Sequence, residues 1–169
     1  MRLLTQILFF SCISLISLPS MAKFTTPAEI MLQLQERGVN SVVAEINEQY
    51  KQDNIIHSIS TGDKQWLNIA FELIPSTHSR FSKEIINALS IALTKNPVEV
   101  LTLAETHSTL SLNDICSIPQ SIKALRQKKE FAKKMMGSLS AAEKSNTGKN
   151  RDNIENCMWE FGKARNVYL

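Results

Sequence analysis

Apolar residues recur every three or four positions along most of the chain, and this spacing is typical of amphipathic helices. The clearest stripe lies in residues 80–95, where Phe81, Ile85 and Leu89 fall on one face. No segment alternates apolar and polar residues for long enough to predict a strand. The pattern therefore predicts an all-α protein with about seven short helices, arranged as an irregular bundle or as packed helical hairpins.

Capping residues locate several helix starts. The sequence TPAE at residues 26–29 places a capping hydroxyl, a proline at the first helical position and a glutamate at the third. These groups suit the free amides of a helix start. NPVE at residues 96–99 repeats the arrangement, by internal duplication or as an independent start, and we favour the second because the intervening residues do not align. Further helices are expected over residues 41–53, 63–74, 80–95, 112–116, 121–139 and 154–162, with residues 54–61 as an irregular or short helical connection.

The segment TGDKQWLNIAFELIP, residues 61–75, is apolar on almost all sides. A helix with this pattern is buried on most of its circumference. We therefore predict that it is the central helix and that Trp66 lies in the core. Trp159 is also expected in the core, and Tyr50 is expected on the apolar face of the helix over residues 41–53.

The first 22 residues have the order of a secretory signal peptide, with Arg2 before an apolar run and the small residues Ser20 and Ala22 after it. Polar residues interrupt the run, whereas a transmembrane helix needs about 20 consecutive apolar residues. We predict cleavage after Ala22, which leaves residues 23–169 as a single helical domain in the periplasm, or secreted. A retained anchor is the alternative.

Cleavage leaves two cysteines, Cys116 and Cys157. An even number of cysteines in an exported protein indicates that they pair in a disulfide. The bond would close a loop of about 40 residues and stabilise the fold by roughly 4 kcal/mol in the chain-entropy model. The alternative is a nucleophilic thiol at Cys116, which needs a base or cation that lowers its pKa, and the sequence identifies none. We therefore predict one disulfide.

Motifs for catalysis and metal binding are missing from the sequence, including a glycine-rich phosphate loop, a nucleophile elbow and a zinc-binding histidine pair. Isolated histidines in or beside predicted connections are expected at the surface rather than on a metal: His57, His78 and His107. Helical glutamates that accompany lysines are expected on solvated faces: Glu72, Glu84, Glu99 and Glu105. We therefore expect a non-enzymatic protein without cofactor or metal. The alternative is a site that is assembled only in the fold.

The segment KALRQKKEFAKK, residues 123–134, concentrates six basic residues around one acidic residue. On a helix over residues 121–139, Leu125 and Met135 face inward and the basic side chains face solvent. We call this set the basic ridge: Lys123, Arg126, Lys128, Lys129, Lys133 and Lys134. It is suited to an acidic protein surface or an anionic lipid, with an ordinary solvated helix face as the alternative.

Net charge argues against a nucleic-acid partner. The full chain carries a formal charge of +3, and loss of Arg2 leaves about +2. Binding to nucleic acid depends on neutralising many phosphates, which requires a larger positive charge. We also expect no stable insertion into a membrane once the leader is removed.

Three segments, GDKQWLNIAFELIP, NALSIALTKNPVEVL and DICSIP, resemble a group of small exported bacterial proteins. Members share a Gly-x-x-x-Trp-Leu helix, an Ala-Leu-rich helix that ends in Asn-Pro, and a cysteine before a proline. The resemblance spans residues 62–119 and implies a helical fold and a disulfide, but no activity.

The general plan of the chain is similar to that of periplasmic immunity proteins, which neutralise cell-wall-degrading effectors of contact-dependent secretion systems. Those proteins are small, exported, helical and often disulfide-bonded. This likeness of plan implies a protein that binds another protein, most concretely an immunity-type inhibitor of an effector that targets the cell envelope. A small envelope hydrolase or ligand-binding protein is the alternative.

Overall fold

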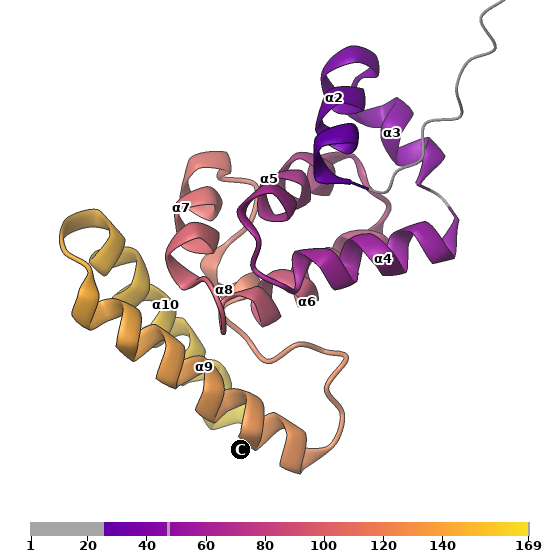
Figure 1. Ribbon diagram of the computed structural model, residues 1–169. Coiled ribbons are helices and arrows are strands. Elements are labelled where there is room, and N and C mark those ends of the chain that lie inside the picture. Colours follow the sequence, from indigo (N-terminus) through magenta and orange to yellow (C-terminus); the bar gives the residue numbers. More distant parts are fainter. Residues whose placement is uncertain (1–25, 47, 169) are drawn as a thin grey trace, which may run out of the picture.

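The protein folds into short helices around one hydrophobic core (Figure 1). A computed structural model describes residues 26–46 and 48–168, with side chains to residue 163. The predicted signal peptide, residues 1–22, lies outside the described residues. Over the described ranges there are nine α-helices, one 3₁₀ helix and no strand, which confirms the all-α prediction. None of these helices is both long enough and apolar enough to span a membrane.

The helices follow one another with short connections. In chain order they are α2 (Pro27–Arg37), α3 (Val39–Glu45), α4 (Gln49–Ile59), α5 (Lys64–Leu73), the 3₁₀ helix η1 (Ile74–Ser76), α6 (Ser79–Ala92), α7 (Pro97–His107), α8 (Leu112–Ile115), α9 (Leu125–Ser145) and α10 (Gly148–Tyr168).

Several helix starts are capped by side chains, and those of α2 and α7 are capped as the sequence predicts. At α2, the Thr26 hydroxyl accepts a hydrogen bond from the Glu29 amide at 3.3 Å, and the Glu29 carboxylate accepts one from the Thr26 amide at 3.1 Å. Side chains also cap α5, α7 and α8: Asp63, Asn96 and Ser111. The cap of α6 was not predicted. It is His78, whose ring Nδ1 accepts a hydrogen bond from the Phe81 amide.

The prediction of one helix over residues 41–53 is wrong. The chain forms two helices, α3 and α4, and α4 continues through the segment that was expected as a connection. A continuous helix would place Tyr50 on the same face as Val42 and Ile46. Helix α4 instead buries Gln52, Ile55 and Ile59. The break therefore changes the phase of the stripe and leaves Tyr50 76% exposed.

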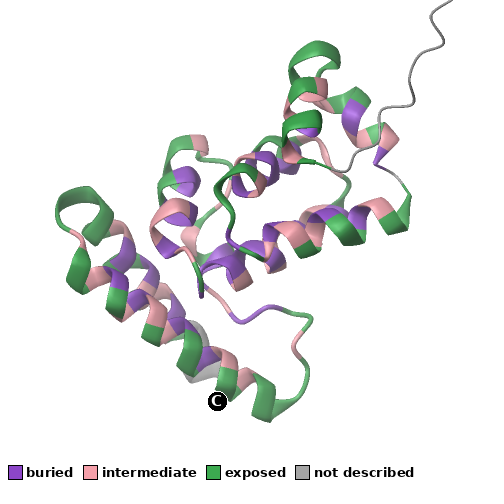
Figure 2. Ribbon diagram, viewed as in Figure 1, coloured by how far each residue is buried: buried purple, intermediate pink, exposed green. Residues whose placement is uncertain are grey.

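Helix α5 is the centre of the fold, as predicted. It contacts α2, α3, α4, α6 and α7. Figure 2 shows buried residues along α5 and on the inner sides of the helices around it. Trp66 is only partly buried and packs against the edge of the core, whereas Phe71 is completely enclosed.

The last two helices form an antiparallel hairpin that packs on α7 and α8 (Figure 1). Met135 and Leu139 of α9 and Cys157 and Phe161 of α10 are buried in it. The prediction that Trp159 is a core residue is wrong, since its side chain is 70% exposed. Trp159 lies two residues beyond Cys157, and residues at that spacing point to opposite sides of a helix. Because Cys157 faces the core, Trp159 faces outward.

The disulfide between Cys116 and Cys157 is present, and both cysteines are fully buried. Cys116 follows α8 directly and Cys157 lies within α10, 41 residues later. The bond therefore ties the C-terminal hairpin to the helices before it.

Helix α9 begins at Leu125, later than predicted, and extends to Ser145. Its capping position is Ala124, which has no side chain that can accept a hydrogen bond. Leu125 was expected to face inward but is 55% exposed, because it lies at the free end of the helix at the edge of the molecule (Figure 1).

We expect Ala124→Ser to raise the free energy of unfolding by about 1 kcal/mol. Serine supplies the missing cap, and Gln127 at the third helical position completes a capping-box sequence. Urea denaturation followed by circular dichroism measures the change. The control is Ala141→Ser, at an exposed position inside the same helix, which should lower stability by about 0.5 kcal/mol through helix propensity. A loss of stability at both positions would contradict the assignment of Ala124 as the cap.

Candidate partner-binding surface

The basic ridge lies along the outer side of α9 and the connection before it. Five of its residues are on the helix, while Lys123 precedes it, in contrast to the predicted helix start at residue 121. Lys128 is partly buried and the other five are exposed. Lys129 and Lys133 are four residues apart and therefore share a face of α9.

The ridge concentrates the positive charge of the protein. Residues 123–134 hold six basic residues and one acidic residue, which gives a local charge of +5. The whole chain is +3, so all other residues together amount to −2. The positive net charge of the protein therefore comes from this one segment.

Basic residues elsewhere on the surface are largely neutralised by ion pairs. Such pairs join Arg37 to Glu45, Lys64 to Glu99, Arg80 to Glu84, Lys149 to Glu105, and Arg151 to both Glu143 and Glu155. In the ridge, Arg126 pairs with Glu130 at 3.5 Å. Among the residues that the structure describes, Lys129, Lys133 and Lys134 form no ion pair. The ridge thus presents positive charge to solvent.

One ion-pair network connects α7 to α10. Lys149 and Asn153 donate hydrogen bonds to the Glu105 carboxylate at 2.6 and 2.9 Å, and these contacts lower the pKa of Glu105. The pKa of Arg151 is raised, first of all by its hydrogen bond to Glu155. Glu105 thus sits among donors on a solvated face, as predicted.

Helix stability does not account for the ridge. The N-terminal end of a helix carries a partial positive charge, and α9 has no acidic residue in its first turn but does have Arg126. A charge of the unfavourable sign there costs about 0.3–1 kcal/mol at low salt. Lys129 and Lys133 repel each other by about 0.2–0.5 kcal/mol. The ion pair of Arg126 with Glu130 offsets part of this cost, whereas Lys129 and Lys133 have no such pair within the described part of the chain.

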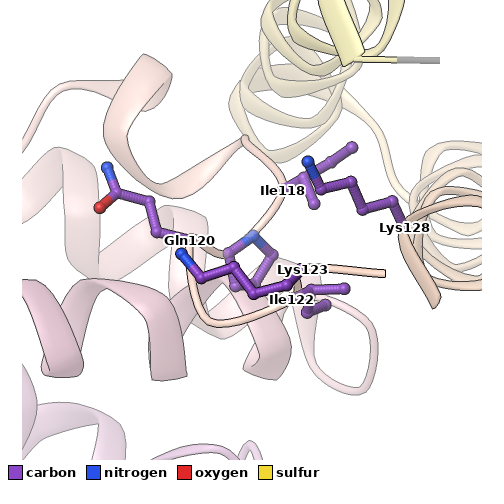
Figure 3. A pocket seen from close by; sticks show the side chains of 6 residues that line it. Ile118, Gln120, Ile122, Lys123 and Lys128 are labelled. Atoms are coloured by element: carbon purple, nitrogen blue, oxygen red, sulfur yellow. The ribbon is translucent and has the colours of Figure 1, made fainter. Parts of the chain in front are cut away.

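A pocket lies at the start of the ridge, between α9 and the connection that leads into it. Its volume is about 270 Å³. We call it the ridge pocket, and its lining residues are Ile118, Pro119, Gln120, Ile122, Lys123 and Lys128 (Figure 3). Both lysines belong to the ridge that the sequence predicts, whereas the pocket was not predicted.

The connection that forms the pocket is held at several points. Cys116, at its beginning, is fixed by the disulfide. The Gln120 amide donates a hydrogen bond to the Asn87 side chain of α6 at 3.0 Å, and the Ile122 amide donates one to the Pro119 carbonyl at 3.0 Å. The pocket is therefore largely formed before any partner arrives.

The three histidines lie apart from this surface. His57 is exposed within α4, so its expected place in a connection is wrong. His78 caps α6, and the His107 ring stacks on Phe71 with centroids 5.5 Å apart. In the described portion of the chain, no three histidine, cysteine, aspartate or glutamate side chains are grouped to hold a metal ion.

Comparisons of the chain with protein-family models, curated proteins and solved structures find no match. The geometry and charge of the ridge and its pocket are therefore the basis for a function.

Proposed function

We propose that this is an exported, non-enzymatic protein that binds another protein with an acidic surface through the basic ridge. Its most specific form is an immunity-type inhibitor of an effector that targets the cell envelope. The observation that carries the proposal is the net charge of +5 over residues 123–134, where Lys129, Lys133 and Lys134 are exposed and form no ion pair with any described residue. A periplasmic location is supported by the disulfide, because such bonds persist in oxidising compartments.

The ridge has the physical properties of a docking surface. A concentrated positive patch attracts an acidic partner during encounter and raises the association rate. Screening limits this attraction to about 8 Å at physiological ionic strength, so it acts in the last step of approach. The helical scaffold beneath it is rigid, which limits the ordering that binding requires.

The ridge pocket does not favour the alternative of a hydrolase. Its lining consists of isoleucine, proline, glutamine and lysine side chains. None of these side chains carries a hydroxyl, thiol or carboxylate group. Hydrolytic sites that act without a metal usually rely on a nucleophile with a general base or on paired carboxylates. The lining supports binding rather than bond cleavage.

We expect the double variant Lys129→Glu/Lys133→Glu to weaken partner binding by about tenfold at low salt, mainly through a slower association rate. The salt dependence of that rate should also decrease. The partner is first captured from periplasmic extract by cross-linking to the wild-type protein, and then purified for stopped-flow measurement. The free energy of unfolding should change by no more than about 0.5 kcal/mol, since both lysines are exposed.

The matched control is Lys83→Glu/Lys144→Glu, which makes the same change in net charge at two exposed lysines outside the ridge. It should retain nearly wild-type association. Equal effects of the two double variants on the association rate would mean that binding depends on net charge alone, which contradicts a role of the ridge. A wild-type association rate for the ridge variant would also refute the proposal.

A further inference from the structure

We propose that the ridge pocket takes one apolar side chain of the partner, flanked by a carboxylate, while the acidic surface around it covers the ridge. This inference rests on the proposed function and identifies the chemistry of the partner at that site. The pocket then serves as the anchor point of the interface and the ridge as its charged border.

The lining of the pocket has two chemical parts. Ile118, Pro119 and Ile122 provide apolar surface. In Figure 3, Lys128 extends from α9 toward Ile118, and Lys123 extends along the other side toward Gln120. Lys123 is exposed, so its stem adds apolar contact while its ammonium group stays in water. A group that fits both parts has an apolar body and a negative charge next to it.

The pocket is large enough for one side chain and small for a large cofactor. Pockets for drug-sized molecules span about 300–1,000 Å³, and this one is smaller, at about 270 Å³. Protein interfaces commonly place one anchor residue in such a pocket, with a polar rim that excludes water around it. The adjacent ridge supplies a rim of matching charge.

The position of the pocket in the fold also suits an anchor. The disulfide at Cys116 and the hydrogen bond from Gln120 to Asn87 fix both ends of the segment that carries Ile118 and Pro119. Since the lining is held in place before binding, little conformational freedom remains to be lost. Ordering of the pocket then offsets little of the gain from apolar burial.

Two synthetic acidic peptides of equal charge test the inference. Both are short, capped runs of glutamate and aspartate, and they differ only in a central leucine or serine. They are titrated at low salt into the isotope-labelled, oxidised protein and followed by NMR. We expect the leucine peptide to bind about tenfold more tightly. It should shift the amides of Gln120, Ile122 and Lys123, whereas the serine peptide shifts mainly those of α9.

Two opposite changes at Ile122 should remove the preference for leucine. Ile122→Ala deletes apolar lining, and Ile122→Trp fills the pocket. Both should leave the affinity for the serine peptide within about twofold, because the ridge is unchanged. Ile56→Ala, at a partly buried isoleucine of α4, is the matched control and should keep the preference. Circular dichroism confirms that each variant is folded.

The outcomes separate the two proposals. Equal affinity for both peptides, with no shift in the pocket, would overturn the anchor and leave the ridge function standing. Failure of both peptides to bind at low salt would overturn the ridge function as well. Dodecanoate is the third probe, and if it occupies the pocket more tightly than the leucine peptide, the ligand is a free fatty acid and the protein anchor is wrong.

Discussion

Replacing Phe71 with alanine is expected to lower the free energy of unfolding by about 3–5 kcal/mol. The ring is completely buried in α5, the helix that touches most of the others, and it also stacks on His107. Its loss leaves a cavity that the surrounding helices cannot close without shifting. Urea denaturation of the oxidised protein measures the effect.

Trp66→Ala in the same helix is the control for this cavity. Trp66 is larger than Phe71, but its ring is only partly buried, so its removal should cost less. If Trp66→Ala proved the more damaging of the two, the position of α5 in the core would be wrong.

Loss of the disulfide is the second large effect. We expect Cys157→Ala to lower the free energy of unfolding by about 2–5 kcal/mol. With a sequence separation of 41 between the cysteines, the chain-entropy model gives roughly 4 kcal/mol. Since the cysteines are buried, part of the effect in this variant arises from the deleted atoms.

Reduction of the wild-type protein isolates the contribution of the bond itself, because the same atoms remain. The reduced protein should unfold at a clearly lower urea concentration than the oxidised protein. Native oxidised protein should also give no reaction of Cys116 or Cys157 with a thiol reagent. Identical unfolding curves before and after reduction would contradict the stabilising role of the bond.

Local features of the fold were predictable from the sequence, because a cap depends on a few adjacent residues. Thr26 and Asn96 begin their helices as expected. The break between α3 and α4 was not predictable in this way, since it depends on which face of each helix meets the core. Gln52 is buried there although it is polar, and Tyr50 is exposed although it is largely apolar.

The candidate site divides in the same way. The basic ridge could be found from the sequence, since its charges lie close together in the chain, over residues 123–134. The ridge pocket could not, because it requires Gln120 to meet Asn87, 33 residues earlier, and Cys116 to meet Cys157. Trp159, in contrast, could have been placed from the sequence, because it lies two residues beyond Cys157 and therefore on the other side of α10.

The uneven distribution of charge makes the molecule an electric dipole. One end carries +5 over residues 123–134, while the rest of the chain sums to −2. An acidic partner is therefore attracted by one end and repelled by the remainder. This difference rotates the protein relative to the partner before any side chains touch. The protein would therefore turn its ridge toward an acidic surface as that surface comes within range. Orientation, as well as attraction, is then set by a single helix.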